Sequence, residues 1–164
     1  MIFPDDILRQ AEQVLAAARA QHVKIATAES CTGGLVAGAL TEIAGSSDVV
    51  ERGFVTYDNA AKSEMLGVPA AMIAQLGAVS EEVARAMADG ALTHAPVDLA
   101  VAITGIAGPG GGTPTKPVGL VHFACARRGR ATAHERHVFA GDRSAVRLAA
   151  LRIALALLTR GLKN

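Results

Sequence analysis

The stretch DLAVAITGIAGPGGGTPTKPVG, residues 98–119, decides the fold, because an apolar run in it ends abruptly in a glycine-rich loop. Residues 98–105 are nearly all apolar, which is typical of a β-strand that is covered on both faces. Residues 106–119 are the most irregular part of the chain and show no helical pattern. Ligands of α/β proteins usually bind beyond the carboxyl ends of such strands. The stretch therefore predicts a buried strand with a binding loop at its end.

Helical and strand patterns alternate before this stretch, whereas two strand patterns pair locally after it. Apolar residues at helical spacing, helix caps and glycine stops define the elements. The patterns predict helices at 4–20, 34–44, 60–67 and 69–77, a longer helix capped by Ser80, a final helix at 144–160 capped by Asp142, and strands at 23–29, 51–58, 98–105, 120–128 and 131–139. We therefore predict an α/β fold, a single three-layer domain over residues 1–164 with a mixed sheet between helices.

Composition and charge argue against several classes of protein. Of the 164 residues, 51% are hydrophobic, which is enough for one continuous core, and the net charge is +1. Aromatic residues make up only 3%, too few to stack bases, so we expect no nucleic-acid binding. The cluster of Arg127, Arg128 and Arg130 fits a solvated hairpin tip. Two acids stand where a secretory signal would be basic, and no apolar run approaches the roughly 18 residues of a membrane span, so we expect a cytoplasmic protein without a membrane segment.

The cysteines and histidines form no pattern of disulfides or metal ligands. Cys31 and Cys125 are too few and too irregular for a disulfide framework or a zinc site, so reduced thiols are expected. His134 and His137 lie three residues apart in a strand pattern, so their side chains face opposite sides of the sheet. We predict no metal site.

Two potential nucleophiles, Ser30 and Cys31, stand in TAESCTGG (residues 27–34) at a strand-to-helix turn. The free N–H groups of a helix that opens at residues 32–34 can hold an oxyanion or a phosphate. Ser30 needs a base to remove its proton, and its position also fits a residue that only caps the helix. Cys31 is intrinsically the stronger nucleophile, but a cysteine beside an apolar strand is more often a buried packing residue.

The base for Ser30 could be Lys62. In the segment TYDNAAK, Tyr57 ends a strand, Asn59 is a plausible helix cap, and Lys62 lies near the first turn of the helix. Burial and the positive end of a helix both lower the pKa of a lysine, which turns it into a general base. Tyr57 could relay a proton or donate to an oxyanion. Both residues also fit plainer roles, Lys62 as a solvated surface lysine and Tyr57 as an amphipathic residue at the sheet margin.

The loop TGIAGPGGGTPTKPVG and Arg143 could bind an anionic ligand. Glycines allow the backbone of such a loop to approach a phosphate closely, although a flexible surface loop has the same composition. The loop is neither a Walker A loop nor a dinucleotide fingerprint, because it lacks a Gly-Lys-Ser/Thr triplet and no helix pattern follows it. Arg143, at the start of the last helix, could bind a phosphate or a carboxylate through bidentate hydrogen bonds.

Five segments together resemble the C-terminal domain family of the competence/damage-inducible protein CinA, and the match spans nearly the whole chain. They are TAESCTGGLVAGAL (27–40), GSSDVVERGFVTYDNAAKSEMLGV (45–68), GAVSEEVA (77–84), AVAITGIAGPGGGTPTKPVGLVHFA (100–124) and FAGDRSAVR (139–147). Several long motifs in one order are far more specific than any one of them. The chain is similar to the stand-alone members of the family, whereas larger members carry an additional N-terminal domain.

The resemblance implies an activity and a set of site residues. The implied reaction is hydrolysis of the carboxamide of nicotinamide mononucleotide (NMN) to nicotinate mononucleotide and ammonia, a step that recycles pyridine nucleotides toward NAD, without a metal or cofactor. The family's nucleophile falls on Ser30, its lysine on Lys62 and its tyrosine on Tyr57. Together with the residues singled out above, the candidate substrate-binding positions are Thr32, Gly33, Gly34, Asn59, Thr104, Gly105, Ala107, Gly108, Gly110, Gly111, Gly112 and Arg143.

The chain departs from the family at three positions beside these motifs. Asp58, Ala60 and His122 stand where many relatives are expected to have Ser, Glu and an aromatic residue. Two other functions stay open, a non-catalytic nucleotide- or phosphate-binding or interaction module and a Ser/Lys amidase with a different substrate. The small-residue helix and the apolar last helix predict a homo-oligomer, most simply a two-fold dimer.

Overall fold

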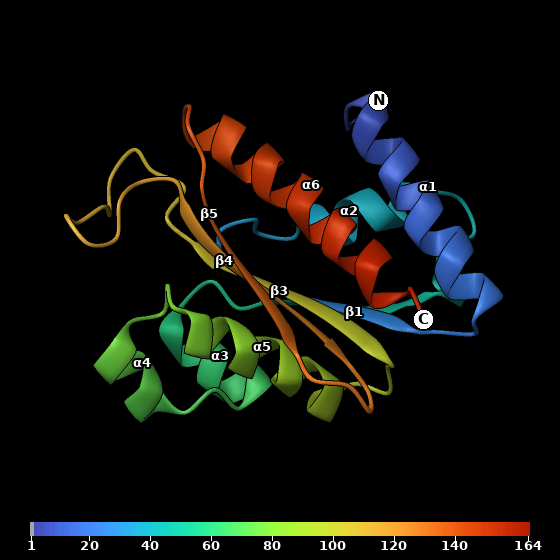
Figure 1. Ribbon diagram of the computed structural model, residues 1–164, viewed down its shortest axis with the longest axis horizontal. Helices are drawn as coiled ribbons and strands as arrows, with labels where there is room; N and C mark the ends of the chain where they lie inside the picture. Colours follow the sequence, from blue (N-terminus) through green and yellow to red (C-terminus); the bar gives the residue numbers. More distant parts are fainter. Residues whose placement is uncertain (1) are drawn as a thin grey trace.

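The apolar strand of residues 98–105 lies at the centre of the molecule. In the computed structural model, which describes residues 2–164, β3 (Leu99–Gly105) is the middle strand of a five-stranded sheet with the order β2-β1-β3-β4-β5 (Figure 1). Six of its seven residues are buried. A strand covered on both faces has few positions for polar side chains, which is why its sequence is almost wholly apolar.

The sheet is mixed, as predicted. β1 (Ile25–Glu29) runs parallel to β2 (Val50–Val55) and to β3, whereas β4 (Leu120–Arg127) and β5 (Ala133–Val138) continue the sheet antiparallel. The three parallel strands therefore end at the same edge. The segments after β1, β2 and β3 carry Ser30, Tyr57 and the glycine-rich loop.

Helices cover both faces of the sheet (Figure 1). One layer contains α1 (Asp5–Ala20), α2 (Leu35–Thr41) and α6 (Arg143–Gly161), and the other contains α3 (Asn59–Leu66), α4 (Ala70–Leu76) and α5 (Glu81–His94). Each layer closes a separate cluster of buried apolar side chains against the sheet. The α/β class and the arrangement of a sheet between helices are thus confirmed.

Local signals located the starts of two helices correctly and misplaced other boundaries. The side chains of Ser80 and Asp142 cap α5 and α6, as predicted. The helix predicted at 34–44 is shorter, because α2 ends at Thr41 and a 3₁₀ turn follows at Ser46–Asp48. The strand predicted at 51–58 runs from Val50 to Val55, because Asp58, rather than Asn59, caps α3 by accepting a hydrogen bond from the N–H of Ala60.

The arginines of the β4–β5 hairpin are not a merely solvated tip. Arg127 donates to the carbonyl of Gly161 (2.6 Å), Arg128 to that of Val97 (2.8 Å) and Arg130 to that of Lys163 (2.8 Å). Gly161 is the last residue of α6, where helical carbonyls lack intrahelical partners, and Lys163 follows two residues later. The prediction of a solvated tip missed this role because the helix end and the hairpin meet only in the folded chain.

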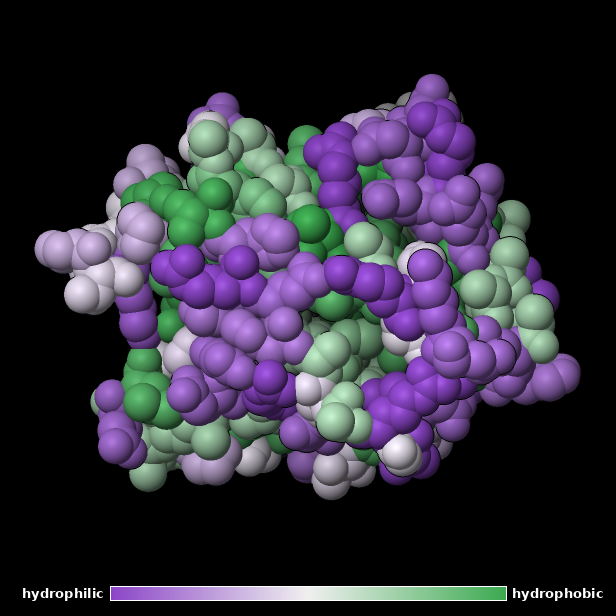
Figure 2. Space-filling model, in the orientation of Figure 1, coloured by the Kyte–Doolittle hydropathy of each residue, from purple (hydrophilic) through white to green (hydrophobic). Residues whose placement is uncertain are grey.

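Polar residues cover the edge of the sheet formed by β5. Figure 2 shows hydrophilic residues gathered across the middle of the face on which β5 lies in Figure 1. Charged side chains on an edge strand discourage pairing with another chain. None of the helices described between residues 2 and 164 has the length and apolar character that crossing a membrane requires.

Candidate active site

Ser30 lies in the turn that follows β1. Its backbone N–H donates to the carbonyl of Ile103 on β3 (3.0 Å), and its carbonyl accepts from the N–H of Gly33 (3.0 Å). The side chain is 8% exposed. Ser30 does not cap α2, because the N-cap residue of that helix is Gly34. The Ser30 hydroxyl is instead directed at a lysine from another part of the chain.

Lys62 brings its amine to Ser30 from the first turn of α3. Its Nζ lies 3.1 Å from Ser30 Oγ, 2.8 Å from the carbonyl oxygen of Thr56 and 3.4 Å from that of Tyr57. An ammonium group donates to all three oxygens. A neutral amine can donate to the two carbonyls and accept the proton of the Ser30 hydroxyl with its lone pair. The three partners therefore suit both protonation states.

Burial favours the neutral form of Lys62. The side chain is 1% exposed, which contradicts the reading of Lys62 as a surface residue. Removal from water lowers the pKa of the amine, and the negative charge of Asp58 acts in the opposite direction. A lysine with a lowered pKa that faces a serine hydroxyl can serve as its general base.

Cys31 belongs to the hydrophobic core beneath the site. It is 5% exposed and packs with the cluster between the sheet and α1, α2 and α6. Burial raises the pKa of its thiol to about 11. A thiol with so high a pKa is almost wholly protonated near neutral pH and is a weak nucleophile. This geometry favours Ser30 over Cys31.

Tyr57 and Arg143 meet at the rim of the site. The tyrosine is 61% exposed, and its hydroxyl accepts a hydrogen bond from Nη2 of Arg143 (3.0 Å). Nη1 of Arg143 donates to the carbonyl of Gly108 (2.9 Å). Tyr57 thus contacts Lys62 only through its backbone carbonyl. The structure offers a direct path for a proton from Ser30 to Lys62 and none through the Tyr57 phenol.

A cavity of about 290 Å³ joins these groups to the glycine-rich loop. Of the predicted residues it is lined by Ser30, Tyr57, Asn59, Lys62, Thr104, Gly105, Ala107, Gly108, Gly110, Gly111 and Arg143. Within residues 2–164, the backbone N–H groups of Gly110 and Gly111 donate to no protein acceptor. Unpaired N–H groups in a glycine-rich loop form a concavity suited to an anion.

Four predicted residues, Thr32, Gly33, Gly34 and Gly112, do not line the cavity. The N–H of Gly33 donates to the carbonyl of Ser30. The N–H groups of Val36 and Ala37, the second and third residues of α2, donate to the buried carboxylate of Glu29 at 2.9 Å and 3.0 Å. Sequence reasoning missed Glu29. Its signal was a carboxylate directly before a glycine-rich helix start, where the helix dipole attracts negative charge.

Sequence reasoning also missed one wall of the cavity. Ala78 and Val79, in the turn between α4 and α5, and Ile106 form apolar surface beside the loop. The turn is held by Thr104, whose buried hydroxyl donates to the carbonyl of Ala78 (2.9 Å). No local pattern marks this wall, because it forms only when two distant loops pack together.

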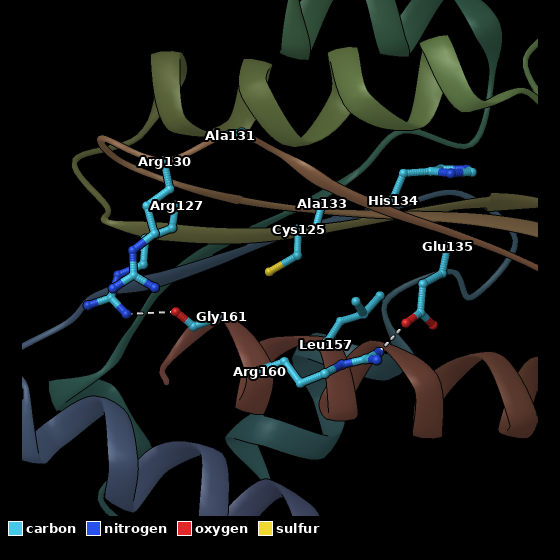
Figure 3. A pocket seen from close by; sticks show the side chains of 10 residues that line it. All are labelled: Cys125, Arg127, Arg130, Ala131, Ala133, His134, Glu135, Leu157, Arg160 and Gly161. Atoms are coloured by element: carbon cyan, nitrogen blue, oxygen red, sulfur yellow. Dashed lines mark hydrogen bonds and ion pairs between the residues drawn. The ribbon is translucent and has the colours of Figure 1, made fainter. Parts of the chain in front are cut away.

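A second cavity of about 280 Å³ lies between the β4–β5 hairpin and α6 (Figure 3). Cys125 and Leu157 lie between Arg127 on one side and Arg160 on the other, and Arg160 forms an ion pair with Glu135 (2.5 Å). Burial raises the pKa of the Cys125 thiol to about 12. In the part of the chain that the structure describes, no group of three or more His, Cys, Asp or Glu side chains is placed to hold a metal.

Fold and site together define an α/β protein with a buried serine–lysine pair beside a glycine-rich loop. The family model of the CinA C-terminal domain matches residues 8–162. The crystal structure of the competence/damage-inducible protein CihA from Agrobacterium tumefaciens superposes with a TM-score of 0.97 and 49% identity, covering 99% of each chain. The chain belongs to the CinA C-terminal domain family.

Similar proteins of two lengths match the chain. The nicotinamide-nucleotide amidohydrolase PncC of Escherichia coli (strain K12) is 52% identical over 150 residues, which cover 92% of this chain and 91% of that protein. The CinA-like protein of Akkermansia muciniphila is 54% identical over 136 residues, covering 83% of this chain. The chain spans only 33% to 38% of the length of that protein and of a CinA-like protein from a Mycobacterium species.

Proposed function

We propose that this protein is a nicotinamide-nucleotide amidohydrolase that converts NMN and water to nicotinate mononucleotide and ammonia. The observation that carries the proposal is the 3.1 Å contact between Ser30 Oγ and the buried amine of Lys62, in a cavity that also contains a loop with unpaired N–H groups. The similarity to the nicotinamide-nucleotide amidohydrolase PncC of E. coli supports the same reaction.

The proposed chemistry proceeds through an acyl-enzyme. Neutral Lys62 takes the proton of Ser30 directly, and Ser30 Oγ attacks the carboxamide carbon to give a tetrahedral intermediate. Protonated Lys62 returns the proton to the leaving nitrogen, and ammonia departs as the C–N bond breaks. Lys62 then deprotonates water, which attacks the ester carbon, and protonated Lys62 returns the proton to Ser30 Oγ as the ester C–O bond breaks and the product leaves. The first proton moves over the 3.1 Å contact between Ser30 Oγ and Lys62 Nζ.

The intermediate carries a negative oxygen that needs hydrogen-bond donors. We assign this role to the backbone of residues 30–34, which we call the nucleophile turn. Within the described chain, the N–H of Cys31, a residue that lines the cavity beside Ser30, donates to no protein acceptor. Preorganised donors of this kind supply a large part of the rate enhancement in acyl transfer.

The phosphate of the nucleotide would bind at the part of the cavity that the glycine-rich loop forms. Gly110 and Gly111 offer unpaired N–H groups there, and Arg143 has three further N–H donors besides the two that hold Gly108 and Tyr57. The apolar surface of Val79 and Ile106 suits the pyridine ring.

The test is a panel of amides incubated with purified protein, with ammonia measured and the products followed by mass. We expect ammonia and nicotinate mononucleotide from NMN, little from nicotinamide riboside or nicotinamide, and none from the Ser30→Ala variant. Thermal stabilisation by NMN without ammonia would instead identify a nucleotide-binding module. Ammonia from another amide, but not from NMN, would identify a Ser/Lys amidase with a different substrate.

A further inference from the structure

Arg147 contacts the nucleophile turn from α6 without entering the cavity. Its Nε donates to the carbonyl of Cys31 (3.1 Å) and its Nη2 to the carbonyl of Thr32 (3.2 Å). Arg147 lies one helical turn after Arg143, so the two arginines share a face of α6. Arg143 reaches the rim of the cavity, and Arg147 reaches the backbone directly behind Ser30.

Arg147 is one of the arginines that donate to backbone carbonyls, as Arg127, Arg128 and Arg130 also do. Arg19, Arg52, Arg85, Arg152 and Arg160 each pair with a carboxylate, whereas within the described residues no carboxylate pairs with Arg147. The side chain is half-buried, and its hydrogen bonds go to two consecutive carbonyls of one turn. A guanidinium group suits this arrangement, because its donors form a rigid planar fork.

Holding these two carbonyls fixes the N–H groups on the same peptides. A trans peptide is planar, so its N–H points opposite to its carbonyl. The Thr32 carbonyl faces Arg147, and the N–H of the same peptide, from Gly33, donates to the carbonyl of Ser30. The Cys31 carbonyl also faces Arg147, which directs the unpaired N–H of Thr32 away from α6.

Gly33 shows how closely the guanidinium group packs against the turn. Its backbone is left-handed (φ +57°), and a Cβ at this position would lie 3.3 Å from Nη2 of Arg147. Both facts favour glycine here, because a side chain would strain the backbone and crowd the arginine. The turn and the arginine therefore depend on each other.

We infer that Arg147 is a positioning residue, which orients the peptides of residues 31–33 for the reaction of Ser30. The inference rests on the proposed function. Arg147 touches neither the amide nor Lys62. It acts through the backbone, by keeping Ser30 Oγ and the peptide groups of the nucleophile turn in the geometry that the tetrahedral intermediate needs.

The experiment compares Arg147→Ala and Arg147→Lys with Arg152→Ala, a matched loss of an arginine on α6 that pairs with Asp6 (2.6 Å). For Arg147→Ala we expect kcat for NMN to fall about ten- to a hundredfold, with KM within about twofold and an unchanged midpoint of the pH profile. The kcat of Arg147→Lys should lie between those of the wild type and Arg147→Ala, because one ammonium group cannot reproduce the planar set of guanidinium donors. Millimolar guanidinium ion should restore part of the activity of Arg147→Ala, and Arg152→Ala should match the wild type.

A second readout needs no substrate. A fluorophosphonate probe labels an activated serine, and intact mass measures the rate at which Ser30 is labelled. If the wild type hydrolyses NMN and Arg147→Ala is labelled at the wild-type rate with unchanged kcat, the inference is wrong and the proposed function stands. If NMN is not hydrolysed but Ser30 is labelled, slowly in Arg147→Ala and faster with guanidinium ion, the substrate is wrong and the inference stands. An equal loss in Arg152→Ala would also overturn the inference.

Discussion

Two cavities of nearly equal size, about 290 Å³ around Ser30 and about 280 Å³ around Cys125, differ in what their polar groups bind. Both contain a buried cysteine with a raised thiol pKa, and both have arginine in their walls. In the second cavity, Arg127 is bound by the carbonyl of Gly161 and Arg160 by the carboxylate of Glu135. These arginines hold the end of α6 and the edge strand together.

The cavity around Ser30 keeps reactive and unpaired groups beside one another. Ser30 faces an amine whose pKa is lowered by burial, and the loop at Gly110 and Gly111 retains free N–H donors. Volume therefore does not distinguish the two cavities. What distinguishes them is that the cavity around Ser30 combines a serine and a buried amine with hydrogen-bond donors that have no protein acceptor.

The largest effect should come from the nucleophile. Ser30→Ala removes the attacking oxygen and should lower kcat for NMN by about a thousandfold or more with the fold intact. Cys31→Ser should matter much less, and Cys125→Ala, in the second cavity, should leave kcat unchanged. Steady-state kinetics with a thermal melt for each variant checks this. A larger loss in Cys31→Ser than in Ser30→Ala would make the cysteine the nucleophile.

Lys62 should control the pH dependence of the reaction. In the proposed mechanism the neutral amine is the base, and burial lowers its pKa, so kcat/KM should rise with pH and reach half its plateau below about 10.4, the ordinary value for lysine. Lys62→Met should cost at least about a hundredfold.

Asp58→Asn supplies a matched test of the same assignment. The negative charge of Asp58 favours the ammonium form of Lys62, so its removal should move the half-activity point to lower pH, while Asn still caps α3. If Asp58→Asn leaves the half-activity pH unchanged, or moves it to higher pH, Lys62 is not the titrating base.

A smaller effect should separate the arginines of the two cavities. Arg143→Ala should lower kcat/KM for NMN about ten- to a hundredfold through lost charge-assisted hydrogen bonds to the phosphate, and should barely change it for nicotinamide riboside. Arg160→Ala should change neither value. Equal losses for both substrates in Arg143→Ala would mean that its bonds to Gly108 and Tyr57 order the site instead.

Features set by neighbouring residues could be predicted from the sequence. The apolar run of β3 and the caps at Ser80 and Asp142 depend on contacts within a few positions. Ser30 and Lys62 could each be named, because each stands at the end of a strand or the start of a helix. Their contact follows from the parallel pairing of β1 with β2, which aligns Glu29 with Val55 and brings both strand ends to one edge.

Features that join distant segments could not be predicted. The buried carboxylate of Glu29, the two hydrogen bonds of Arg147 and the apolar wall at Val79 depend on which loops and helices pack together. Tyr57 shows the same limit, since its hydroxyl meets Arg143, which is 86 residues away, rather than Lys62 on the adjacent helix. Residue type and spacing carry no information about such partners.

The smallest effect concerns stability, through a histidine pair that reaches the wall of the second cavity. Nδ1 of His122 lies 2.9 Å from Nε2 of His134, and His134 lines that cavity. Burial lowers the pKa of His122 from 6.5 to about 4, with further lowering by His134, Arg136 and Lys116 against the opposing charge of Glu81. Between these values the unfolded chain binds more protons than the folded one, so stability is lost as pH falls from about 6.5 toward about 4. We expect a loss from this group on the order of 2 kcal/mol between pH 7.5 and pH 5, measured by denaturant unfolding, and a smaller loss in His122→Phe. An equal loss in the variant would show that His122 is not the group that makes the free energy of unfolding fall with pH.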